Sequence, residues 1–245
     1  MPFLIKLRHA AAAVAIAVVL TACGVGSPST VPRPVGDGSL QVMVYNIHAG
    51  KDAKGVDNLA RVAALVREAG ADLVLLQEVD RNTTRSGKVD QPAELAKMTG
   101  YSVALGKSLD FQGGDYGIAL LSRSPIGAWE RVHLPVEPPQ ERSGGSHEAR
   151  VALVATVATS AGPVTIVNTH LDASREDTYR RQEVRRIVAL VDSLRARGTP
   201  VIIGGDFNST PESAAQEDVR RSGMRDSWTE CGRGGALTFP ANVPV

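Results

Sequence analysis

The chain has 245 residues, 43% of them hydrophobic, which is enough to bury the core of one α/β domain. Aromatic residues make up only 4%, so the sequence offers few side chains on which the bases of single-stranded nucleic acid could stack. The formal net charge of +1 argues against the broad positive field with which general DNA-binding proteins attract their ligand.

The N-terminal residues predict an export signal. Lys6 and Arg8 precede an apolar run over 10–20, which is about half the length that a membrane-spanning helix needs. The sequence Leu20-Thr21-Ala22-Cys23 is typical of a bacterial lipobox. In that interpretation, residues 1–22 are a signal peptide that is removed. An uncleaved anchor and an ordinary signal peptide are the alternatives.

Lipidation of Cys23 would fix the mature chain to the bacterial membrane. Residues 23–38, rich in Gly, Pro and Ser, then form a flexible tether in front of a domain over 39–245. Removal of the signal peptide takes away the cations of Lys6 and Arg8 and no acid, so the mature chain stays close to neutral. We therefore predict an exported protein, lipid-anchored at the cell envelope.

Strands and helices alternate in the first half of the domain. The predicted elements are a strand over 40–47, a helix over 59–69, a strand over 72–78 and a helix from Asp90 to Gly100. Leu59, Val62 and Val66 recur at helical spacing, and Gly70 is a typical residue with which a helix ends. Pro92 suits the first turn of the second helix.

The second half is richer in strands. The predicted elements are strands over 102–106, 116–122, 149–159, 163–169 and 200–204, and a helix over 176–197. Ser160-Ala161-Gly162-Pro163 predicts a tight hairpin turn. Residues 125–147 and 230–245 are predicted to be loops. Helices that separate apolar strands, together with hairpins, favour an α/β sandwich with mixed sheets.

Four predicted strands end in a polar residue. These residues are Asn46, Glu78, His170 and Asp206, with Asn208 two positions after Asp206. Loops at strand ends present polar groups from a rigid scaffold, so the pattern favours a hydrolytic metal site over a core. Mg²⁺ prefers oxygen ligands and keeps several waters, so Glu78 and Asn46 would suffice to bind Mg²⁺ or Mn²⁺. No Cys/His spacing in the sequence resembles a tetrahedral zinc site.

Three residues are candidates for contact with a phosphate group. The imidazole of His170 can donate a hydrogen bond or a proton to a phosphate oxygen near neutral pH. Arg150 lies within a strand pattern, where its charge needs a partner, either phosphate or the neighbourhood of Glu148. Tyr116 fits a phosphate contact and a core position equally well.

Six segments in order resemble the endonuclease/exonuclease/phosphatase superfamily, which includes DNase I-like nucleases, neutral sphingomyelinases and inositol-phosphate phosphatases. They are Tyr45-Asn46-Ile47-His48, Leu76-Gln77-Glu78-Val79-Asp80, Asp115-Tyr116-Gly117-Ile118-Ala119-Leu120-Leu121-Ser122, Glu148-Ala149-Arg150, Asn168-Thr169-His170-Leu171-Asp172 and Gly205-Asp206-Phe207-Asn208. The resemblance implies a four-layer DNase I-like α/β sandwich, with two stacked mixed sheets flanked by helices.

The resemblance also implies roles for the site residues. The position of His170 contacts the scissile phosphate, Asp206 orients or deprotonates the attacking water, and Asn208 donates to phosphate. The family also closes with a strand and a Ser-Asp-His sequence that helps to activate the water. This sequence contains no Ser-Asp-His, so the last strands are expected to be missing.

The leading hypothesis is a metal-dependent phosphoesterase that hydrolyses a phosphodiester or a phosphomonoester. Its substrate would be phospholipid-derived, a small molecule or a nucleic acid, with the first two preferred; no protein partner is predicted. The alternative is a catalytically inactive binding lipoprotein on the same scaffold, because the Ser-Asp-His sequence is absent. A chain truncated at its C-terminus is a third interpretation. The sequence contains no nucleophile elbow or Cys/His arrangement that would favour a protease.

Overall fold

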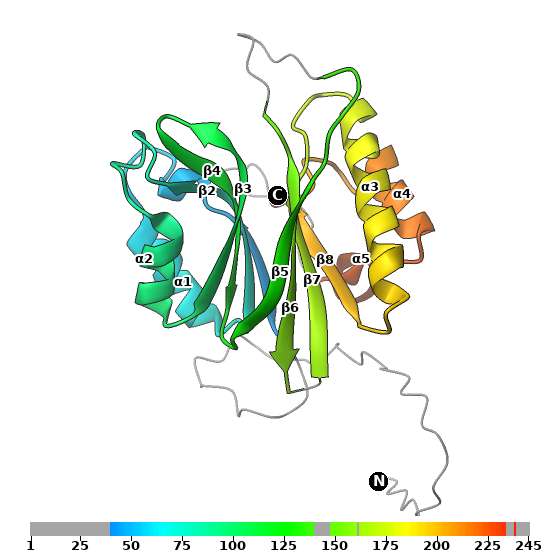
Figure 1. The fold of residues 1–245 in the computed structure, drawn as a ribbon, viewed down its shortest axis with the longest axis horizontal. Helices are drawn as coiled ribbons and strands as arrows, with labels where there is room; N and C mark the ends of the chain where they lie inside the picture. Colours follow the sequence, from blue (N-terminus) through cyan, green and yellow to red (C-terminus); the bar gives the residue numbers. More distant parts are fainter. Residues whose placement is uncertain (1–39, 140–147, 161, 234–237, 239–245) are drawn as a thin grey trace, which may run out of the picture.

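Two four-stranded sheets pack face to face, with helices on both outer sides (Figure 1). The computed structural model describes residues 40–139, 148–160, 162–233 and 238. The predicted signal peptide, the lipidation site Cys23 and the tether lie outside these residues, so envelope anchoring stays a prediction of the sequence. Within the described ranges, every helix is too short or too polar to cross a membrane.

The first sheet has the strand order β1-β2-β4-β3. Its strands are β1 (Val42–Asn46), β2 (Leu73–Arg81), β3 (Ser102–Phe111) and β4 (Gly114–Ser122). β1 runs parallel to β2, whereas β4 is antiparallel to both of its neighbours. Its outer face is covered by α1 (Leu59–Ala69) and α2 (Gln91–Thr99), and a short 3-10 helix, η1 (His48–Gly50), follows β1.

The second sheet has the strand order β5-β6-β7-β8. Its strands are β5 (Ile126–His133), β6 (Val151–Thr159), β7 (Gly162–His170) and β8 (Val201–Asp206). β7 and β8 are parallel, and the other pairs are antiparallel. The long helix α3 (Thr178–Arg195) and α4 (Ala214–Arg221) cover the outer face, and α5 (Ser227–Cys231) follows them. The predicted four-layer sandwich is confirmed.

Side chains of β2 alternate between two cores, as the period of a strand requires. Val74 and Leu76 pack with α1, while Leu73 and Leu75 face the second sheet. Leu153 and Ile166 complete the core between the sheets. Both faces of β2 are therefore buried, which explains why this strand begins with the apolar run Leu73-Val74-Leu75-Leu76.

A buried amide joins the two sheets. Asn168 on β7 accepts a hydrogen bond from Gln77 Nε2 (2.8 Å) on β2. Its own Nδ2 donates to the carbonyl oxygens of Leu76 (3.1 Å) and Ala119 (2.9 Å) on the first sheet. The side chain is wholly buried, so these bonds fix how the two sheets meet in an otherwise apolar interface.

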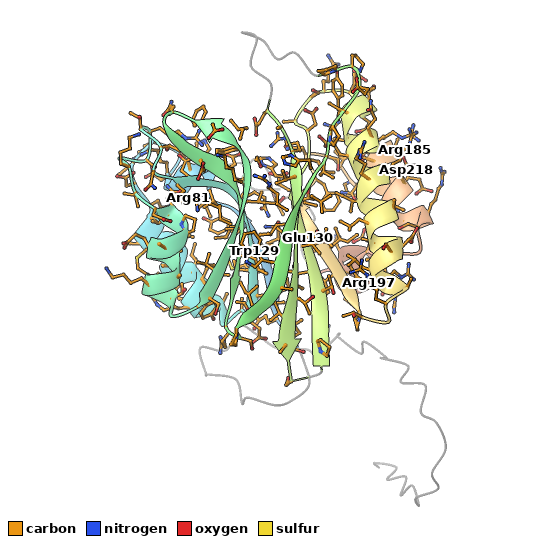
Figure 2. The ribbon with its side chains drawn as sticks, viewed as in Figure 1. Arg81, Trp129, Glu130, Arg185, Arg197 and Asp218 are labelled. Carbon is orange, nitrogen blue, oxygen red and sulfur yellow. The ribbon has the colours of Figure 1, made fainter. Side chains whose placement is uncertain are left out.

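The prediction of a loop over 125–147 was wrong, because β5 occupies Ile126–His133. Most β5 residues are exposed, among them Trp129 and Glu130, which are labelled in Figure 2. Only β6 pairs with this strand within the described residues. Because most of its side chains are exposed, its sequence lacks the apolar run of a strand buried on both faces. The strand predicted over 149–159 begins at Val151, which places Arg150 just before β6.

Replacing Asn168 by alanine should destabilise the protein by roughly 3 kcal/mol, because three buried polar groups would lose a partner. Urea unfolding of the purified protein measures this change. Asn58→Ala is a control, since Asn58 precedes α1 without a side-chain cap bond, and its effect should stay below about 0.5 kcal/mol. Equal stability of the wild type and Asn168→Ala would contradict the proposed role.

Candidate active site

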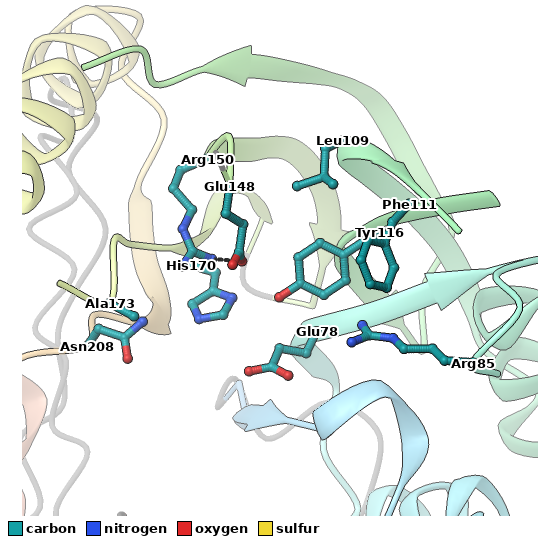
Figure 3. Close-up of a pocket in the computed structure, with 10 residues that line it drawn as sticks. All are labelled: Glu78, Arg85, Leu109, Phe111, Tyr116, Glu148, Arg150, His170, Ala173 and Asn208. Carbon is teal, nitrogen blue, oxygen red and sulfur yellow. Dashed lines mark ion pairs between the residues drawn. The ribbon is translucent and has the colours of Figure 1, made fainter. Parts of the chain in front are cut away.

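A pocket of about 320 Å³ holds most of the predicted site residues (Figure 3). It is lined by Glu78, Arg85, Leu109, Phe111, Tyr116, Glu148, Arg150, His170, Ala173 and Asn208. Five of these residues were predicted from the sequence, and Asn46 and Asp206 join them through hydrogen bonds. Both sheets contribute to the lining.

Glu78 enters the pocket through an irregularity in β2. The pairing of β2 with β4 shifts register between Leu76 and Val79, and Glu78 has a φ of 55°. A left-handed backbone is uncommon for a glutamate, and such outliers concentrate at functional sites. The bulge turns the carboxylate toward the pocket, while the preceding Gln77 stays buried between the sheets.

The amide of Asn46, at the end of β1, connects two carboxylates. Its Nδ2 donates to Glu78 Oε1 (2.9 Å) and to Asp206 Oδ2 (3.0 Å). Its Oδ1 accepts a hydrogen bond from the backbone N–H of His48 (3.0 Å). The Asn46 side chain is thus hydrogen-bonded to two carboxylates that come from different sheets.

Asp206 ends β8, where the backbone runs very close to β7. Gly205 has a φ of 148°, and a Cβ atom there would lie 2.0 Å from the carbonyl oxygen of Thr169. Only glycine fits this approach. Beyond it, the backbone N–H of Asn208 donates to Asp206 Oδ1 (2.9 Å), and Asn208 Nδ2 donates to the carbonyl of Leu171 (2.8 Å). Both oxygens of the Asp206 carboxylate therefore accept hydrogen bonds.

His170 lies beside this acid because β7 and β8 are parallel and pair His170 with Asp206. Its Nε2 is 3.9 Å from Asp206 Oδ2, and the side chain is largely buried on the pocket wall. A protonated His170 would be attracted to this carboxylate at that distance. Asn208 lies on the same side of the pocket as His170 (Figure 3).

Tyr116 and Arg150 occupy the upper wall in Figure 3. Arg150 is buried and pairs with Glu148 through Nη1 and Oε1 at 2.6 Å. Its Nε has no hydrogen-bond partner among the described residues. Burial, followed by the nearby carboxylates of Glu148 and Glu78, raises the pKa of the Tyr116 hydroxyl well above its ordinary value. Tyr116 therefore stays protonated and can donate a hydrogen bond.

The residues around Asn46 fit a divalent cation with oxygen ligands. The carboxylates of Glu78 and Asp206 are both hydrogen-bonded to the Asn46 amide. Carboxylate and amide oxygens are ligands that Mg²⁺ prefers. In the structure, the Nδ2 group of Asn46 faces the two acids. The amide would have to rotate for its oxygen to bind a metal ion beside Glu78. No group of three or more His, Cys, Asp or Glu residues suitable for a metal occurs in the described part of the chain.

Sequence reasoning missed Arg85, Leu109, Phe111 and Ala173, and it named Glu148 only as part of the neighbourhood of Arg150. Leu109 and Phe111 lie on the part of β3 beyond the predicted strand 102–106. Arg85 follows β2 in a polar turn, a position that gives no indication of a pocket. Its location depends on contacts with β3 and β4, which the sequence pattern does not contain.

Behind Arg150, a smaller cavity of about 110 Å³ reaches Glu183 on α3. Glu183 Oε2 accepts a hydrogen bond from the backbone N–H of Asp172 (2.9 Å). Burial is the main cause that raises the pKa of Glu183 to about 7, while Arg150 and Arg180 oppose this rise. Burial therefore favours the protonated form of this carboxyl.

Residues 43–244 match the model of the Endonuclease/Exonuclease/phosphatase family. The protein YbhP of Escherichia coli (strain K12), itself uncharacterized, is 26% identical over 215 residues, which cover 84% of this chain and 81% of YbhP.

Solved structures share the fold. An endonuclease/exonuclease/phosphatase from Beutenbergia cavernae is 25% identical with a TM-score of 0.61, over 77% of this chain and 55% of its own. This chain thus spans little more than half of that protein. The mannosyl-6-phosphatase of Bacteroides thetaiotaomicron has a TM-score of 0.62 at 18% identity, over 78% of this chain and 74% of its own. The catalytic domain of human Nocturnin has a TM-score of 0.56 at 19% identity, over 74% and 68%.

Because the pKa of Glu183 is raised in the folded protein, the free energy of unfolding should fall as pH rises from about 4.5 to about 7. The folded protein holds this proton more tightly than the unfolded chain, so stability is full below the unfolded pKa and reduced above the folded one. The loss is about 3 kcal/mol at most. Urea unfolding of wild type and Glu183→Gln across this range measures it. The free energy of unfolding of the wild type, relative to that of Glu183→Gln, should fall as pH rises. A difference between the two proteins that stays constant over this pH range would contradict the assignment.

Proposed function

Because the chain belongs to the endonuclease/exonuclease/phosphatase family, we propose that it hydrolyses phosphate esters with the help of Mg²⁺ or Mn²⁺. The observation that carries this proposal is the amide of Asn46, which holds Glu78 and Asp206 beside a pocket lined by His170 and Asn208. The phosphatase activity named for the Bacteroides thetaiotaomicron relative supports the same reaction class.

Glu78 and Asn46 would hold the metal ion, which supplies Lewis acidity that offsets negative charge on the phosphate and the leaving oxygen. Asp206 is the base in this proposal. Its two hydrogen bonds, from Asn46 and from the backbone of Asn208, fix the carboxylate in one orientation. It takes a proton from the water whose oxygen attacks phosphorus, while the bond between phosphorus and the leaving oxygen breaks.

Three side chains would bind the phosphate group. His170 donates a hydrogen bond from beside Asp206, and Asn208 can donate with the N–H that Leu171 does not use. Arg150 keeps a buried Nε without a partner among the described residues, and a phosphate oxygen would satisfy such a donor. Donors fixed before the reaction stabilise developing charge without reorganisation.

The pocket favours a small phosphate ester over duplex DNA. Its volume of about 320 Å³ is at the lower end of the range for small-molecule sites. A near-neutral chain also lacks the long-range attraction that polyanions exploit.

Hydrolysis of p-nitrophenyl phosphate and bis-p-nitrophenyl phosphate with Mg²⁺ or Mn²⁺ tests this proposal. Asp206→Asn and Glu78→Gln should each lower kcat by roughly 100-fold or more, because each removes a group that acts on the reacting atoms. Glu68→Gln is a matched control, since Glu68 is exposed and pairs only with Arg61 among the described residues; its kcat should match the wild type.

Turnover that survives Asp206→Asn at the wild-type rate would refute the assigned base. If the folded wild type hydrolyses neither ester yet binds Mn²⁺, the inactive binding scaffold becomes the better account.

A further inference from the structure

One cation of the pocket has no part in the proposed chemistry. Arg85 lies across Glu78 and Tyr116 from His170 and Asn208 (Figure 3). A phosphate held by His170 and Asn208 is therefore separated from Arg85 by the width of the pocket. Any group of the substrate that reaches Arg85 belongs to another part of the molecule.

Arg85 is held in place from two directions. Its Nε and Nη2 donate to the two carboxylate oxygens of Asp80, at 2.7 Å and 2.8 Å. The guanidinium also stacks on the rings of Phe111 and Tyr116, at 4.6 Å and 5.2 Å from their centroids. A bidentate pair and a cation–π stack together fix both the plane and the rotation of the group.

The carboxylate of Asp80, which binds Arg85, is wholly buried. Burying this charge costs free energy. Thr83 Oγ1 donates to Asp80 Oδ2 (2.7 Å), which completes the set of donors around this acid. A buried charge survives only when it is paired and hydrogen-bonded. The interaction also raises the pKa of Arg85, so this side chain stays a cation.

The third nitrogen of the Arg85 guanidinium is not used by the bonds to Asp80. Nη1 of Arg85 makes no hydrogen bond within the described residues, whereas Nε and Nη2 do. The side chain is partly exposed and lines the pocket. The N–H groups of a guanidinium bind carboxylate and phosphate oxygens more strongly than neutral acceptors. Leu109 and Phe111 add apolar surface near it.

We propose that Arg85 binds a second acidic group of the substrate, on the part of the molecule that leaves when the phosphate ester is cleaved. This inference rests on the proposed hydrolysis of phosphate esters. The substrate class is a small phosphate ester whose leaving group carries a carboxylate or another phosphate. Arg85 determines specificity, and it takes no part in bond cleavage.

Binding of non-hydrolysable phosphonates tests Arg85 without any turnover. Phosphonobutyrate and butylphosphonate carry the same phosphonate, but only the first has an acid at its other end. Isothermal titration calorimetry of the full chain with Mg²⁺ should show roughly tenfold tighter binding of phosphonobutyrate by the wild type. Arg85→Gln should abolish this preference and leave the affinity for butylphosphonate unchanged.

Arg81→Gln is the matched control. Arg81 lies on β2 and pairs with Asp115, which keeps Lys107 as a second partner at 2.8 Å. Arg81 does not line the pocket. This variant should keep the preference for phosphonobutyrate.

Arg85→Gln leaves the buried Asp80 without its cation, so thermal unfolding accompanies the titration. If that variant does not fold, Arg85→Gln combined with Asp80→Asn replaces the ion pair by two neutral amides and should show the same loss of preference. Equal binding of the two phosphonates by the wild type, a preference that survives removal of Arg85, or binding of neither ligand would overturn the proposal. Failure of ester hydrolysis alone would refute the proposed function and leave the measured preference standing.

Discussion

The site depends on the hydrogen bonds that one amide makes with two acids. Asn46 joins Glu78, which belongs to the same sheet, to Asp206, which lies 160 positions further along the chain and in the other sheet. Carboxylates brought close together repel one another. A shared donor reduces that repulsion, and a divalent cation would do so more strongly. The ends of the two sheets can therefore meet at an acidic centre, and the pocket forms beside it.

The apolar layers hold the strand ends that carry the site residues in position. Each sheet is held between an inner core and helices on its outer face, so its strand ends have little freedom to move. Asn168 and Gln77 then add a buried polar contact between the two sheets. Directional bonds in such a place fix one arrangement of the sheets, which apolar packing alone specifies less sharply.

The sequence predicted the parts of the site that depend on local patterns. Asn46, His170 and Asp206 follow apolar strands directly, so the strand pattern itself located them. The bulge at Glu78 could not be foreseen, because it arises from the register between β2 and β4. β5 was missed for a related reason, since its exposed residues carry no apolar run.

Arg85 illustrates the limit of local reasoning. Asp80 is near it in sequence, but Phe111 and Tyr116 come from two other strands. An arginine in a polar turn resembles any solvated side chain until these strands are placed beside it. The candidate site residues at strand ends are therefore visible in the sequence, whereas Arg85, which we propose selects the substrate, is visible only in the fold.

The central claim is that Glu78 and Asn46 form the metal site at the ends of the strands. The most direct measurement is anomalous X-ray scattering from crystals of the protein soaked in Mn²⁺. The account predicts a peak bonded to the Glu78 carboxylate next to Asn46, and its loss in Glu78→Gln. A manganese peak elsewhere in the pocket, with Glu78 bonded only to protein atoms, would contradict the account.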